Sequence, residues 1–154
     1  MKVRDVMTAD VVVVHPDASV NLVARLMASR GISGVPVVED GKKVVGIISE
    51  LDLIVRNTRL EPPAFFALLD GRIPLETPGH YRRRLQHMLG TLARDVMTAK
   101  VVTIGPEEEL ESLAELMVKR RVNPVPVVED GRLVGIISRS DIVRMMARDL
   151  ESPA

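Results

Sequence analysis

The chain has 154 residues, 46% of them hydrophobic, and its 21 basic side chains balance 21 acidic ones. A net charge of zero gives no long-range attraction toward nucleic acid, and the absence of cysteine excludes disulfides, thiolate metal sites and a cysteine nucleophile. The apolar runs are too short to span a bilayer, and no signal-peptide pattern opens the sequence. We therefore expect a cytoplasmic protein with no membrane segment.

An internal repeat dominates the sequence. Residues 3–41 match residues 93–131 at 20 of 39 positions, and the second copy then continues in step with the first after the loss of one residue. The strings Arg-Asp-Val-Met-Thr-Ala, Val-Pro-Val-Val-Glu-Asp-Gly and Val-Gly-Ile-Ile-Ser-x-x-Asp occur once in each copy. Agreement this dense indicates a duplicated structural unit.

Each copy is predicted to begin with a strand followed by a helix. In the first copy, Val11–Val14 is an all-valine run typical of a buried strand. Apolar residues within 20–27 then recur at the i, i+3, i+4, i+7 spacing of an amphipathic helix, which Gly31 ends. The second copy repeats the pattern, with a predicted strand at Val101–Ile104 and a helix that begins near Leu110.

A hairpin and a second helix complete each copy. In the first, Val35–Val38 and Val44–Ile48 are predicted strands joined by an Asp-Gly turn, and Ser49 opens the helix that follows. The corresponding elements of the second copy are strands at Val125–Val128 and Leu133–Ile137 and a helix from Ser138. A unit this small is marginally stable alone. We therefore expect an α/β (α+β) fold in which two β-α-β-β-α repeats pack with pseudo-twofold symmetry.

The chain divides into three parts: the first repeat at residues 1–59, a connecting segment at 60–92 and the second repeat at 93–154. Proline and glycine punctuate the connecting segment, which is predicted to form short helices at Pro63–Leu69 and His80–Leu92. This helical insertion keeps apolar residues at helical spacing, so we expect it to dock on another surface. A dimer interface is the use we expect for it.

The repeats resemble a known family. Units that open near Asp-Val-Met-Thr, centre on Val-Pro-Val-Val and close with Gly-Ile-Ile-Ser-x-x-Asp are similar to a tandem pair of cystathionine-β-synthase (CBS) domains, or Bateman module. The resemblance implies a non-catalytic regulatory module that binds adenosine-containing ligands in clefts between the repeats. The candidate ligands are AMP, ADP and ATP, followed by S-adenosylmethionine and NAD. The resemblance also implies a homodimer and a regulated partner protein that the sequence does not name.

Two Ser-x-x-Asp motifs carry the candidate chemistry: Ser49 with Asp52, and Ser138 with Asp141. Both side chains of each motif face the first turn of a helix. An aspartate accepts hydrogen bonds only and suits the vicinal hydroxyls of a ribose, while the serine and the N–H groups of the turn can receive a phosphate. The same pattern fits a capping box, in which these side chains satisfy the helix's own N–H groups. The two roles are compatible.

By the same resemblance, each motif faces a cleft that the other repeat completes, and aliphatic side chains hold the adenine. The implied residues are Thr8, Val12 and Ile32 beside Ser138 and Asp141; Thr98, Val102 and Val122 beside Ser49 and Asp52; and backbone groups near Val35-Pro36 or Val125-Pro126, which read the adenine edge. The motifs differ at Glu50 and Arg139. We expect an anionic phosphate to prefer the site near Arg139 by about 1 kcal/mol, unless both side chains point to solvent.

Two other functions stay open. The first is a ligand-free dimeric scaffold that uses residues 60–92 as its contact surface. The second is nucleic-acid binding through Arg82–Arg84, a run of three arginines. An exposed helix face is the ordinary role of such a run, and all three aromatic residues lie between the repeats, which disfavours base stacking by the repeats themselves. The histidines lack metal-ligand spacing, and no nucleophile–base pair points to an enzyme.

Overall fold

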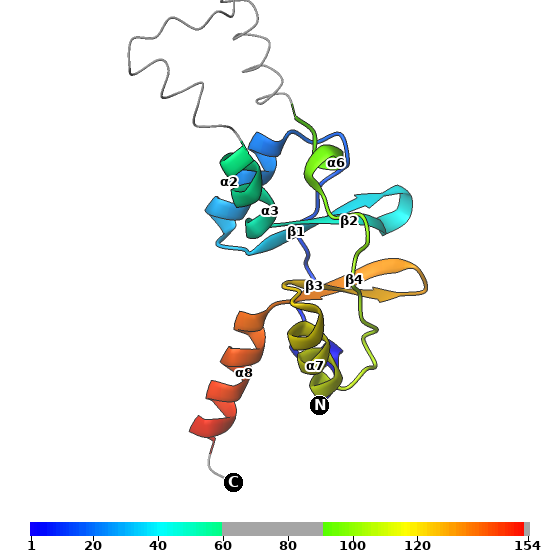
Figure 1. The fold of residues 1–154 in the computed structure, drawn as a ribbon. Helices are drawn as coiled ribbons and strands as arrows, with labels where there is room; N and C mark the ends of the chain where they lie inside the picture. The colour runs from blue at the N-terminus through cyan, green and yellow to red at the C-terminus, as the bar shows by residue number, and fades with distance from the viewer. Residues whose placement is uncertain (60–90, 153–154) are drawn as a thin grey trace, which may run out of the picture.

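The computed structural model describes residues 1–59 and 91–152 and contains two similar halves, each built on an antiparallel hairpin (Figure 1). The predicted mixed fold of two packed repeats is confirmed. The predicted helix Pro63–Leu69 and most of the predicted helix His80–Leu92 lie outside the described residues, but the last two residues of the second helix are described and are not helical, with Leu92 in an isolated bridge to Ser19. The elements are α1 (Val3–Val6), α2 (Val20–Arg30), β1 (Gly34–Glu39), the 3-10 turn η1 (Asp40–Lys42), β2 (Lys43–Ser49), α3 (Glu50–Arg59), α6 (Ala93–Val96), α7 (Leu110–Arg120), β3 (Val125–Glu129), β4 (Arg132–Ile137) and α8 (Arg139–Glu151).

The long helices and hairpins form where the sequence predicts them. Helix α2 begins after Ser19, whose Oγ accepts a hydrogen bond from the Leu22 amide at 3.1 Å, and it ends at Gly31 with φ of 60°. This left-handed conformation favours glycine. The second repeat places Arg121 at the same point, with φ of 53°. Helix α7 therefore ends on a residue that carries a backbone cost absent from α2.

The predicted strands at Val11–Val14 and Val101–Ile104 are wrong. Within the first run only Val14 pairs, as an isolated parallel bridge to Val37. The second run likewise contributes a single bridge, from Ile104 to Val127. The physical reason is that each run crosses from one half of the molecule to the other and touches a hairpin at one point, and Val13 is 40% exposed.

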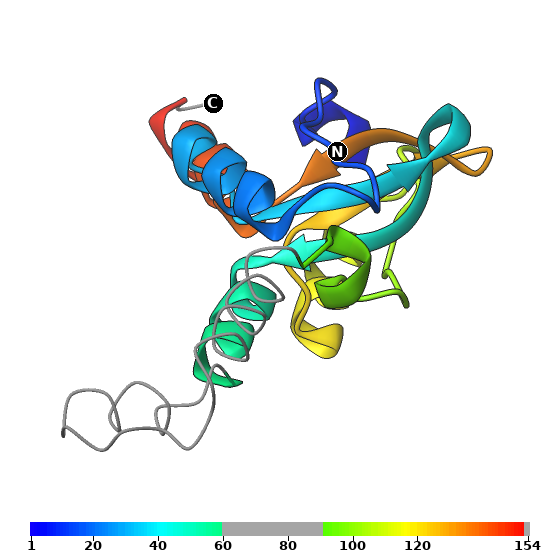
Figure 2. The ribbon, with the colours of Figure 1, turned by 90° about the horizontal axis from the view of Figure 1, so that it is seen from above.

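The N-terminal segment of each repeat packs on the hairpin of the other repeat. The short helix α1, which the sequence did not predict, buries Val3 in the second repeat's core, and α6 buries Ala93 in the first repeat's core. Thr8 exchanges two 2.9 Å backbone hydrogen bonds with Ile136 of β4. Figure 2 shows α1 beside the orange hairpin strand and α6 beside the cyan one. Each half is therefore assembled from both copies.

Two glycines permit this exchange. Gly135 in β4 lies so close to Met7 that a Cβ there would overlap the methionine sulfur, and it would also lie 3.1 Å from the Thr8 carbonyl oxygen. Gly46 in β2 has the same relation to Met97. The repeated Met and Gly of the two motifs are thus contact partners across the repeats.

None of the described helices is long and apolar enough to cross a membrane.

Candidate functional site

The Ser-x-x-Asp motif of the second repeat forms a capping box at the start of α8. Oδ2 of Asp141 accepts hydrogen bonds from the amide of Ser138 at 2.7 Å and from its hydroxyl at 2.9 Å. The first repeat has the same arrangement, because Oδ2 of Asp52 accepts from the amide and hydroxyl of Ser49 at 2.9 and 3.1 Å. Capping uses Oδ2 in both motifs. Oδ1 is left for a second role in each.

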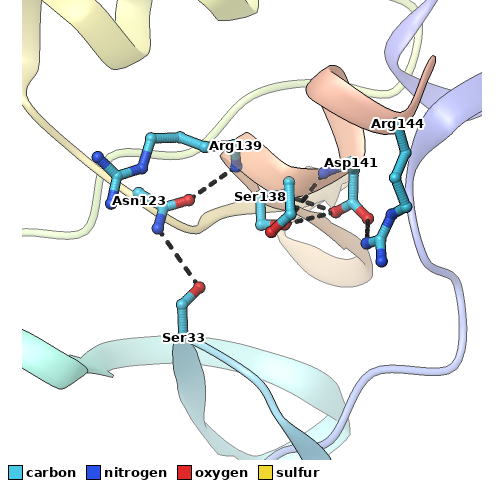
Figure 3. A network of polar contacts seen from close by, with 7 residues as sticks. Ser33, Asn123, Ser138, Arg139, Asp141 and Arg144 are labelled. Carbon is cyan, nitrogen blue, oxygen red and sulfur yellow. Dashed lines mark hydrogen bonds and ion pairs between the residues drawn. The ribbon is translucent and has the colours of Figure 1, made fainter. Parts of the chain in front are cut away.

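Oδ1 has a different partner in each repeat. Nη2 of Arg144 donates to Oδ1 of Asp141 at 2.6 Å (Figure 3), whereas Oδ1 of Asp52 accepts from the Thr98 hydroxyl at 3.4 Å. The Arg144 side chain is 65% exposed, and an ion pair of this kind contributes at most about 1 kcal/mol. A ligand can therefore replace it at little cost. The i, i+3 spacing of the two residues was a sequence signal for this contact that our prediction missed.

A cavity of about 290 Å³ opens beside Ser138 and Asp141. Its walls bring together Thr8, Val12 and Ile32 with these two residues, which is the set that the family resemblance implied. We call this cavity the Ser138 site. Its volume is close to the lower end of the usual range for small-molecule sites. The remaining lining residues, which the sequence did not point to, include Asp10, Ser33, Glu50, Pro124, Ser140 and Arg144.

Arg139 does not line the Ser138 site. Glu50, from the first repeat, lies there instead, and Arg139 lines a larger cavity of about 840 Å³ together with Ser49, Val122 and Arg121. The expectation that a phosphate at Ser138 has Arg139 beside it is therefore not matched by the geometry. The first residue of each second helix thus lies beside the opposite motif, and Glu50 borders the larger cavity as well.

The other predicted residues are brought together in part. We call Ser49, Asp52, Thr98, Val102 and Val122 the Ser49 site, in which Thr98 contacts Asp52 and two members, Ser49 and Val122, line the larger cavity. Backbone groups near Val35-Pro36 or Val125-Pro126 were predicted to read the adenine edge, and the preceding residues Gly34 and Pro124 line the Ser138 site. Val35, Pro36, Val125 and Pro126 are buried in the hairpins and line neither cavity. The Pro36 and Pro126 carbonyls already accept 3.1 Å hydrogen bonds from Val14 and Ile104.

A short polar network joins the repeats at the axis. Asn123 donates through Nδ2 to the Ser33 hydroxyl at 3.4 Å and accepts through Oδ1 from the Arg139 amide at 2.9 Å (Figure 3). Ser33 and Asn123 occupy corresponding positions in the two copies, so the network ties the start of α8 to the first repeat.

Among the described residues no cluster of three or more His, Asp or Glu side chains could hold a metal ion. Arg82–Arg84 lies outside the described residues.

The profile of the CBS domain matches residues 3–56 and again residues 93–148. The chain belongs to the CBS domain family. An uncharacterised protein of Methanocaldococcus jannaschii is 33% identical over 95% of this chain and 91% of its own length. The crystal structure of CBSX2 in complex with AMP is 26% identical, has a TM-score of 0.72, and covers 96% of this chain and 97% of its own. The fold is thus that of a tandem CBS pair.

CBS pairs also occur inside enzymes. The inosine-5′-monophosphate dehydrogenase of Methanocaldococcus jannaschii is 31% identical to this chain over 93% of the chain's length. The match covers only 23% of the dehydrogenase. The similarity to that enzyme is therefore confined to a minor part of its length.

Proposed function

We propose that this CBS pair is a non-catalytic regulatory module that binds adenosine-containing nucleotides of the AMP, ADP and ATP class between its repeats. The observation that carries the proposal is a pocket for ribose and adenine at the Ser138 site, where Thr8, Val12, Ile32, Ser138 and Asp141 line one cavity, and the Ser49 site repeats the Ser-x-x-Asp motif. A relative of the same fold, CBSX2, has been crystallised with AMP. The proposal places the protein in the cytoplasm, as a sensor of cellular energy state.

The chemistry of binding follows from the Oδ1 atom of Asp141. The ribose hydroxyls donate to this oxygen once Arg144 moves away, while Oδ2 keeps the cap on α8 intact. Charged acceptors make hydrogen bonds roughly twice as strong as neutral ones. Val12 and Ile32 are both half-buried and supply the apolar surface for the adenine ring.

A ligand in the Ser138 site touches both repeats, and this is how it signals. Thr8 belongs to the first copy and is fixed to β4 of the second, while Ile32 precedes β1 of the first. The ligand shifts the angle between the repeats to the extent that it binds one arrangement more tightly than the other. A partner protein then recognises the favoured arrangement.

We propose further that two copies of the chain form a homodimer through α3 and α8. Ile54 of α3 and Val143 of α8 are equivalent in the two repeats and are 55% and 63% exposed. Apolar positions repeated about a pseudo-twofold axis suit the self-complementary contact of a symmetric dimer. Light scattering should show a dimer that Ile54→Glu with Val143→Glu dissociates, whereas Lys42→Glu on the exposed turn leaves it intact. A monomeric wild-type protein would contradict this part of the proposal.

Isothermal titration with AMP, ADP and ATP tests the binding. At least one should bind, and Asp141→Asn combined with Asp52→Asn should weaken it by about tenfold or more, because charge assistance is lost. Asp5→Asn is the matched control, since Asp5 accepts from the Lys2 amide at 2.9 Å in the same capping geometry but lines neither cavity. Absence of binding for all three nucleotides would favour the ligand-free scaffold. Equal binding of GMP would contradict the adenosine class.

A further inference from the structure

The charged residues that line the Ser138 site are mostly acidic. Asp10, Glu50 and Asp141 contribute three carboxylates, and Arg144 is the one basic residue in the cavity wall. Arg144 already pairs with Asp141 at 2.6 Å. Three carboxylates against one guanidinium leave the cavity wall with an excess of negative charge whether or not Arg144 stays paired with Asp141. A dianionic phosphate placed here is repelled, and a ligand without a phosphate is not.

The duplicated sequence reverses these charges at the Ser49 site. Lys100 occupies the position of Asp10, and Arg139 occupies the position of Glu50. Arg121 adds a third cation where the first copy has Gly31. Arg121 and Arg139 line the larger cavity together with Ser49 and Val122. Glu50 also borders that cavity, but two arginines outnumber it.

The backbone of Arg121 supports a role for its charge. This residue holds the left-handed conformation, φ 53°, that the first copy assigns to glycine. A non-glycine residue in this conformation carries a steric cost that glycine avoids. Strained residues of this kind cluster at functional sites. Position 121 therefore carries a guanidinium group although glycine would adopt this backbone conformation with less strain.

We infer that the two sites select ligands of opposite charge: the Ser49 site takes the adenosine nucleotide that carries a phosphate, and the Ser138 site takes an uncharged or cationic adenosyl compound. The inference rests on the proposed function and adds the division of ligands between the sites. Both sites keep the aspartate for the ribose. The distinguishing charges come from three pairs of corresponding positions, 10 and 100, 31 and 121, and 50 and 139.

Titrations of AMP and adenosine into single-site variants test this inference. Asp141→Asn weakens ligand binding at the Ser138 site, so that binding at the Ser49 site is measured. The Ser49 site should prefer AMP over adenosine by about tenfold, because each of two or three partly exposed cations raises the affinity for AMP about 3- to 5-fold. Asp52→Asn leaves the Ser138 site, which should prefer adenosine. Ile32→Phe and Val122→Phe, which narrow the Ser138 and Ser49 sites respectively, serve as a second pair if either aspartate variant melts early.

Charge variants then identify the cause. In the Asp141→Asn background, Arg139→Gln should weaken AMP about 5-fold and leave adenosine unchanged. In the Asp52→Asn background, Glu50→Gln should strengthen AMP by a similar factor. Equal preference in both sites, or the reverse preference, would overturn this inference while the proposed function stands. Failure of adenosine, AMP, ADP and ATP alike to bind the wild-type protein would overturn the proposed function and this inference together.

Discussion

The contact between Gly135 and Met7 gives the most direct test of how the repeats are joined. In Gly135→Ala, the new methyl group overlaps the sulfur of Met7, lies 3.0 Å from its Cγ and lies 3.1 Å from the Thr8 carbonyl oxygen. The methionine side chain must move, and the paired Thr8–Ile136 hydrogen bonds are pushed apart. Overpacking of this kind costs about 1–3 kcal/mol. We expect a loss of about 2 kcal/mol in the free energy of unfolding, or about 4–8 °C in Tm.

Urea denaturation followed by circular dichroism measures this loss, and a second substitution tests its cause. Met7→Ala removes the overlapping atoms. The double variant Met7→Ala with Gly135→Ala should therefore lose at least about 1 kcal/mol less free energy of unfolding than the two single variants lose together. Gly105→Ala is the matched control, because a Cβ there meets only the Glu108 Cγ, at an ordinary 3.6 Å. Additive effects of the two substitutions would refute the argument that α1 packs on β4 through this contact.

Three further perturbations have expected effects on stability of about 1 kcal/mol or less. Arg121→Gly should raise the free energy of unfolding by about 0.5–1 kcal/mol, since glycine accepts φ of 53° without strain. The same substitution should weaken AMP binding. Thermal melts measure the first effect and titration the second, and an unchanged AMP affinity would show that Arg121 takes no part in the Ser49 site. Arg4 and Glu107 form an ion pair whose side chains are 54% and 52% exposed, so a double-mutant cycle should give a coupling below about 1 kcal/mol that salt removes. A larger coupling that resists salt would contradict this exposed pairing. Asn123→Ala leaves the Arg139 amide without its side-chain acceptor and should cost about 1 kcal/mol in urea denaturation; no change would mean that water replaces the amide fully.

The elements that the sequence predicts correctly are those set by local rules. Helix α2 follows from apolar spacing and its glycine stop, and the β1–β2 hairpin follows from alternating strands around Asp-Gly. The run Val11–Val14 fails because four consecutive valines are equally compatible with a crossing segment that touches a strand once. Short helices such as α1 are also beyond local rules, since four residues gain stability from tertiary packing and little from propensity.

The site residues show a different limit. Thr8, Val12 and Ile32 join Ser138 and Asp141 as the family pattern implied, whereas Arg139 lines the cavity at Ser49 and Glu50 lines both cavities. Periodicity identifies which residues share one helix face, but it does not state which copy's residues meet across the axis. That pairing depends on the exchange of α1 and α6, a long-range feature with no counterpart in local spacing.

The exchange of N-terminal segments also explains why the unit occurs twice in one chain. The Ser138 site needs Thr8 and Val12 from one copy and Ser138 and Asp141 from the other, so a lone copy cannot assemble the site within itself. Once both copies reside in one chain, each position can change independently. Asp10 and Lys100, and Glu50 and Arg139, are corresponding positions that now carry opposite charges. Duplication therefore supplies both the completeness of each site and the freedom for the two sites to differ in the ligands they accept.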